Sequence, residues 1–177
     1  MKKLLKRTFY ATLGLIALGA TYLFVISNSE KFATDIAYLE CALDQVGSDK
    51  HDNNFLDLVR NHHPKYIVGR LREDWIENKV LLTWVADVGD SENGLDSKVK
   101  LNISTNTYSG FSYDGSFTFG TQRTFDRNTL LYTNERKPTS TAEVDHWLTR
   151  KCVIVDKSIY EEKRKKSAAA TKAKQTI

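Results

Sequence analysis

The side chains best suited to acid–base or metal chemistry are four histidines: His51, His62, His63 and His146. His51 lies close to Asp49 and Asp52, and this grouping could form a small cation site. His62 and His63 are adjacent, so in regular structure their side chains point in different directions. The polar surroundings of His51 fit an exposed loop equally well, and we predict no metal site.

General acid–base catalysis would require two carboxylates whose surroundings separate their pKa values. Asp87 and Asp114 lie beside apolar segments, but a glycine follows each within two residues, as in turns. The chain has no G-x-S-x-G, P-loop, Rossmann glycine or H-E-x-x-H motif. We therefore predict no catalytic residue and no cofactor. A hydrolase-like enzyme with an unrecognised site, in which the histidines converge with Asp87, stays an alternative.

Two cysteines, Cys41 and Cys152, lie near the two ends of the central part of the chain. In an exported protein an even, small number of cysteines indicates a disulfide. Closing a loop of about 110 residues would stabilise the fold by roughly 4–5 kcal/mol in the chain-entropy model. We predict a Cys41–Cys152 disulfide, with two buried free thiols as the alternative.

Aromatic side chains are concentrated in segments that alternate between apolar and polar residues. In a small curved sheet such residues fill the core, but they can also line an apolar pocket at the mouth of a barrel. The candidate ligand-binding set is Trp75, Trp84, Tyr108, Phe111, Tyr113, Phe117 and Phe119.

The elements that would position these residues are mostly strands. Apolar residues recur at helical spacing over 30–47, which predicts a first helix ending at Gly47, and a second short helix should end before Pro64. Alternating segments then predict about seven strands: Tyr66–Leu71, Val80–Val88, 98–103, Tyr108–Tyr113, Phe117–Phe125, Leu130–Thr133 and His146–Val155. The links are short, including the Asp114-Gly115 hairpin turn, so neighbouring strands should be antiparallel. The expected class is α+β, mainly β: a meander, curved sheet or small barrel with one or two N-terminal helices.

Residues 8–26 form an uncharged apolar stretch that four basic residues precede: Lys2, Lys3, Lys6 and Arg7. This stretch is about long enough to span a bilayer, and the preceding charges favour a cytoplasmic N-terminus with the rest exported. We expect a signal anchor in a bacterial inner membrane with a periplasmic domain, or a cleaved signal peptide as the alternative. The predicted divisions are a cytoplasmic basic segment 1–7, the membrane segment 8–26, an exported β-rich domain 27–156 and a basic, mostly disordered tail 157–177.

The net charge of +4 arises at the two ends of the chain. Residues 27–156 contain 15 basic and 20 acidic residues, a net charge of −5. An acidic body argues against a nucleic-acid partner.

The chain resembles many small exported bacterial proteins with no assigned activity. The resemblance rests on the N-terminal apolar segment, D-R-N-T-L at Asp126–Leu130, C-V-I-V-D at Cys152–Asp156 and the lysine-rich end. It implies a compartment and a shape only. The body is also similar in architecture to lipocalin barrels, although their G-x-W signature is missing because Leu71 lies two residues after Gly69.

These observations predict a membrane-anchored, extracytoplasmic, non-enzymatic binding or interaction module. Its partner would be a protein or a small apolar ligand. A lipocalin-like carrier of an apolar ligand is the main alternative, and it would require the aromatic residues to enclose a pocket.

Overall fold

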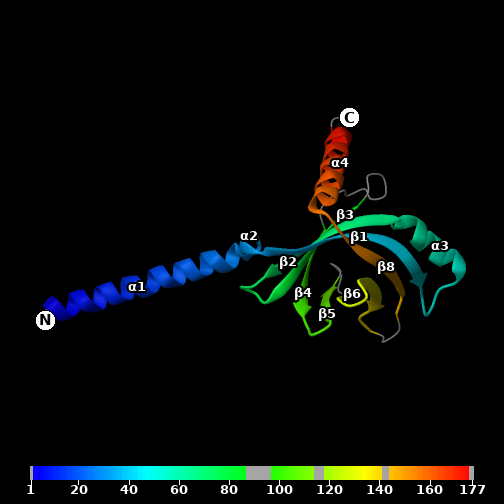
Figure 1. Cartoon of the computed structure of the whole chain (residues 1–177). Helices are drawn as coiled ribbons and strands as arrows, with labels where there is room; N and C mark the ends of the chain where they lie inside the picture. The colour runs from blue at the N-terminus through cyan, green and yellow to red at the C-terminus, as the bar shows by residue number, and fades with distance from the viewer. Residues whose placement is uncertain (1, 87–96, 114–117, 141–143, 176–177) are drawn as a thin grey trace.

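Eight antiparallel strands form a closed barrel in the computed structural model, which describes residues 2–86, 97–113, 118–140 and 144–175. Each strand pairs with its neighbours in the chain, and the first pairs with the last (Figure 1). The strands are β1 Thr34–Gly47, β2 Tyr66–Asp74, β3 Lys79–Ala86, β4 Ser97–Ile103, β5 Thr107–Tyr113, β6 Phe119–Asp126, β7 Leu131–Pro138 and β8 His146–Val155. The predicted mainly-β, antiparallel architecture is confirmed. The predicted Asp114-Gly115 turn lies outside the described residues.

The predicted count of seven strands is one too low, because β1 occupies the segment predicted to be a helix. Its pairing register shifts between Asp35 and Ala37 and again between Leu43 and Gln45. Each bulge adds one residue and changes which positions face the interior. Ala37, Leu39, Cys41 and Leu43 alternate on the inner face, and the second bulge shifts the next inward apolar residue to Val46. The spacing of Leu39, Leu43 and Val46 therefore also fits a helix. Only Ser29–Phe32 (α2) of the predicted first helix is helical.

The predicted disulfide between Cys41 and Cys152 is present, and it joins β1 to β8 where these strands close the barrel. The two cysteines face each other in the register, with their Cα atoms 4.0 Å apart. The amide of Cys152 donates to the carbonyl of Leu130 at 3.0 Å, on the side of β7. The disulfide is part of the buried core.

The apolar core occupies the end of the barrel where the chain enters from α2. Its buried residues come from all eight strands: Leu39, Cys41, Ile67, Leu71, Val80, Leu82, Trp84, Leu101, Tyr108, Phe125, Tyr132 and Cys152. Here the barrel is filled by its own side chains, as is usual for eight strands.

The helix α3 (Asn53–His62) covers part of the opposite end. Asp52 caps it by accepting a hydrogen bond from the Phe55 amide at 3.1 Å, and the helix ends before Pro64 as predicted. Val59 packs with Val46 and Leu148, which are paired residues of β1 and β8. Leu148 lies two residues before Arg150, which points into the barrel, so Leu148 also faces inward. The helix α3 that packs on it therefore lies over the interior rather than on the outer wall.

The C-terminal helix α4 (Lys157–Gln175) corrects the prediction of a mostly disordered tail. Tyr160 is buried outside the barrel against Val68 and Val85. Lys163 forms an ion pair with Glu40 at 3.1 Å. Tertiary contacts therefore hold the start of a segment whose sequence shows no clear apolar period.

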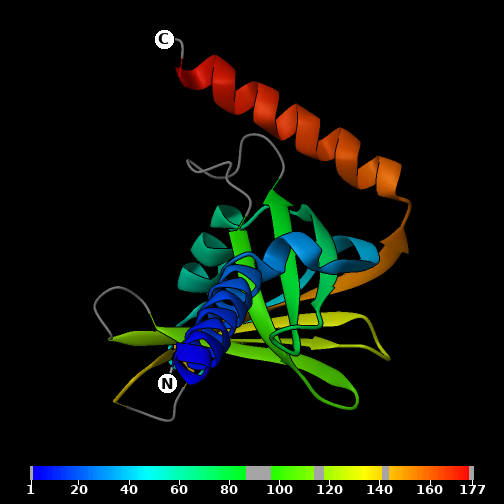
Figure 2. The same cartoon turned by 90° about the vertical axis from the view of Figure 1, so that its left-hand side faces the viewer.

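The N-terminal helix α1 (Lys2–Ser27) extends away from the barrel, at the end opposite α3 (Figures 1 and 2). Within the part of the chain that the structure describes, no helix meets both the length and the apolar character needed to cross a membrane.

Candidate functional site

The candidate site is the half of the barrel interior on the α3 side, which we call the mouth. Phe125 and Tyr132 are paired core residues and point inward. Arg123 lies two residues before Phe125 and therefore shares its face. Arg150 pairs with Tyr132 and also points inward. Beyond the apolar core, the inward positions of β6 and β8 thus carry two arginines.

Arg150 is the most deeply buried charged side chain in the mouth, with 3% of its surface exposed. Its Nη1 atom is buried and has no hydrogen-bond partner. Burial lowers the pKa of Arg150 to about 10, so the guanidinium is still charged at neutral pH. Among the described residues, no carboxylate forms an ion pair with Arg150 or with Arg123.

Tyr132 lies between the core and these cations. Burial raises the pKa of its hydroxyl, while the charges of Arg123 and Arg150 act in the opposite direction. The Trp84 ring packs edge-on against Tyr132 with the centroids 5.0 Å apart, and the Trp84 side chain also acts to lower the pKa of the Tyr132 hydroxyl. Arg123 donates from Nη1 to the Ser112 hydroxyl at 2.6 Å. The mouth therefore concentrates hydrogen-bond donors and positive charge.

His63, just after α3, belongs to the same neighbourhood. Burial, together with the charges of Arg150, His146 and His62, lowers its pKa to about 4. His63 is consequently neutral at pH 7 and can donate or accept one hydrogen bond at each ring nitrogen. It also lines a groove of about 650 Å³ between α3 and the β1–β2 wall.

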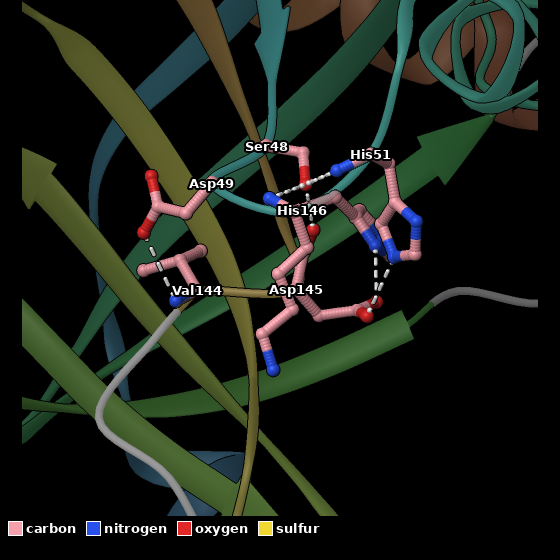
Figure 3. Close-up of polar contacts among 7 residues, drawn as sticks. Ser48, Asp49, His51, Val144, Asp145 and His146 are labelled. Atoms are coloured by element: carbon pink, nitrogen blue, oxygen red, sulfur yellow. Dashed lines mark hydrogen bonds and ion pairs between the residues drawn. The ribbon is translucent and has the colours of Figure 1, made fainter.

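At the rim, one carboxylate holds two of the four histidines (Figure 3). Asp145 contacts Nε2 of His51 at 3.0 Å and Nδ1 of His146 at 2.9 Å. Burial would raise the pKa of Asp145, but its hydrogen bonds to the two histidines lower it. The Ser48 hydroxyl donates to the Asp145 carbonyl and accepts from the His51 amide at 3.1 Å. These contacts tie the segment before α3 to the start of β8.

Such a carboxylate can orient an imidazole as a general base. Among the described hydrogen bonds, however, no hydroxyl or thiol bonds to the ring of His51 or His146. Within the described residues, no group of three or more potential ligands could hold a metal ion. The contacts of Asp145 therefore have a structural role, because they hold the segment before α3 against the start of β8. Asp49 and Asp52, which lie near His51 in the sequence, have other partners: Asp49 accepts from the Val144 amide at 3.1 Å, and Asp52 caps α3. Asp87 lies outside the described residues.

The predicted aromatic set is not gathered in one place. Trp84 and Tyr108 are core residues, 7% and 6% exposed. Trp75 is 67% exposed at the β2–β3 turn, and Phe111 is 50% exposed on the outer wall. Phe119 lies under the Arg136 guanidinium, 4.4 Å from the ring centroid. Phe117 and the side chain of Tyr113 lie outside the described residues.

Arg123 and Arg150 were not among the site residues predicted from the sequence, although the sequence contains a signal for both. Arg123 and Phe125 alternate in a predicted strand, and so do Arg150 and Cys152. In both pairs, an arginine shares a face with a residue expected in the core.

No protein-family model, curated protein or solved structure matches this chain.

Proposed function

We propose that this chain is a non-enzymatic binding module that takes up a small ligand in the mouth of its barrel. Residues 8–26 would hold it at a membrane, with the barrel outside the cytoplasm. The observation that carries the proposal is the buried, unpaired Nη1 of Arg150. A buried donor without an acceptor is costly in a folded protein, and sites that bind ligands are where such costs are tolerated.

A ligand in the mouth is better supported than the other binding modes we considered. Protein partners often add a strand to a free sheet edge, but the described strands close on one another from β1 to β8. An apolar carrier needs an aromatic pocket, whereas Trp84 and Tyr108 are packed within the core. Donor groups at the mouth indicate a polar contact with the ligand.

The proposed membrane tether, residues 8–26, is supported by the exposed apolar side chains of α1. Their exposed fractions lie between 50% and 70% for Tyr10, Leu13, Leu15, Ile16, Leu18, Tyr22, Leu23 and Phe24. Such a surface is unfavourable in water and favourable in lipid. The disulfide is typical of an oxidising compartment outside the cytoplasm.

Native mass spectrometry of the full chain, released from membranes in detergent, tests the proposal. We expect a reproducible extra mass that leaves on denaturation. Asn134→Phe should abolish it, because Asn134 pairs with Arg123 and so faces the mouth. Thr133→Phe is the matched control, since the neighbouring residue faces outward and should leave the extra mass in place.

Two outcomes would contradict the proposal. An unmodified mass in every preparation would remove the evidence for a ligand. Loss of the extra mass in Thr133→Phe but not in Asn134→Phe would show that the ligand binds outside the barrel. Extraction of the membranes with alkaline carbonate tests the tether separately. The full chain should stay in the membrane pellet, and its release would contradict anchoring.

A further inference from the structure

We propose that the ligand carries an oxyanion, a carboxylate or phosphate group, that binds between Arg150 and Arg123 inside the mouth. This inference rests on the proposed binding function and names the chemical class of the ligand. It would be a small organic acid or phosphate ester whose charged group enters first.

The charge of Arg150 favours an anionic ligand. A buried ionised group is strongly unfavourable unless it is paired, so buried arginines usually contact carboxylates. Arg150 is 3% exposed, and no ion pair compensates it among the described residues. Asp145, the acidic residue at the nearby rim, already bonds to His51 and His146. An incoming anion would provide the missing charge.

An oxyanion also suits the hydrogen-bonding groups of Arg150. Its buried Nη1 atom, which has no acceptor among the described residues, is a donor. Arginine side chains have no acceptor atoms. A neutral amide or alcohol could accept a hydrogen bond from this group but would leave its charge uncompensated, whereas an oxyanion compensates the charge and can bind a guanidinium through two hydrogen bonds.

The groove beside α3 would give an anion access to the mouth. The groove between α3 and the β1–β2 wall is lined by His63, Arg60 and Lys65, together with one acidic residue, Asp44. Asp44 pairs with Lys151 at 2.9 Å. Leu43, which also lines the groove, pairs with Arg150 across β1 and β8, so the groove lies beside the mouth. Its cations would attract an anion despite the acidic body, because local charge governs approach at short range.

Binding of matched probes to the full chain in detergent tests the inference at constant ionic strength. The probes are benzoate, phenyl phosphate and the neutral analogue benzamide, assayed by thermal unfolding and titration calorimetry. We expect at least one anion to raise the melting temperature saturably, because a ligand that binds only the folded state stabilises it. Benzamide should have no effect. The anion that binds more tightly, benzoate or phenyl phosphate, indicates whether the ligand carries a carboxylate or a phosphate group.

Arg150→Met supplies a second, opposite readout. It should weaken anion binding by about tenfold or more, because a charge-assisted contact is lost. Without a probe it should raise the melting temperature, because an unpaired buried charge is replaced by an apolar side chain of similar length. Arg123→Met should also weaken binding. Arg127→Met is the control, because Arg127 is exposed at the β6–β7 turn and should leave binding unchanged.

Equal binding of benzamide and the anions would overturn the inference, as would unchanged anion binding in Arg150→Met. Failure of both anions to bind would also overturn it, and that comparison requires no variant. In each case the proposed function would still stand if native mass spectrometry found a mass that Asn134→Phe removes. Absence of the extra mass from the wild-type protein as well would overturn both the inference and the proposed function.

Discussion

His63 shows how the charge of the mouth acts on a single side chain. Burial lowers its pKa to about 4, and Arg150 and His146 act in the same direction. In the unfolded chain a histidine titrates near 6.5. Between these two values the unfolded state binds a proton that the folded state does not. The free energy of unfolding should therefore fall as the pH decreases through this window.

His63→Gln should remove this contribution and flatten the dependence of stability on pH between about 6.5 and 4. Thermal unfolding of both proteins across that range measures the difference. His62→Gln is the control, because His62 is exposed at the end of α3 and should keep the wild-type slope. Equal slopes in wild type and His63→Gln would contradict the prediction.

The arginines of the mouth could be placed partly from sequence. Alternation puts Arg123 on the face of Phe125, and this much follows from a correctly assigned strand. Arg150 points into the same part of the interior as Arg123 because β8 pairs with both β7 and β1. No local sequence pattern encodes this closure of the barrel. The position of His63 depends on α3 folding over the barrel end, which only tertiary packing determines.

At the scale of elements, the sequence predicted β2 to β6 and β8 closely because their apolar residues alternate, whereas β7 continues to Pro138, beyond the predicted Leu130–Thr133, because its second half is polar. It failed at β1, where two bulges disturb the alternation. Leu39, Leu43 and Val46 have the spacing of a helix face but belong to an alternating inward row that the second bulge interrupts, whereas Ile36 is 44% exposed at the first bulge. The period of a long bulged strand is therefore a weak guide to its structure.

The helix α3 should depend on its cap, because it is short and largely exposed. Asp52→Ala removes the acceptor of the Phe55 amide and should destabilise the protein by about 1 kcal/mol. Loss of α3 packing should appear as faster amide hydrogen exchange over Asn53–His62. Asp57→Ala, an exposed position within the helix, is the control. Unchanged exchange in Asp52→Ala would mean that packing alone holds α3.

At the scale of the whole molecule, closure of the barrel brings together strands that are far apart in the chain. Cys41 and Cys152 are 111 residues apart, and their bond fixes the β1–β8 pair in register. Long loops lose the most entropy on closure, so this pairing is the costliest contact for the unfolded chain to form. The disulfide lies in the buried core, and Cys152 is two residues from Arg150 on the same inward face of β8.

Reduction should therefore destabilise the fold without removing the binding groups. In the chain-entropy model a loop of this length contributes about 4–5 kcal/mol, which corresponds to roughly 10 °C in melting temperature. Thermal unfolding with and without reductant measures this, and Cys41→Ala combined with Cys152→Ala serves as a reductant-independent comparison. Below its lowered melting temperature, the reduced protein should still carry the ligand mass, because the pairing of β8 with β1 and β7 still places Arg150 on the inner face of the barrel. Identical melting in both states would show that β1 and β8 stay paired without help from the disulfide.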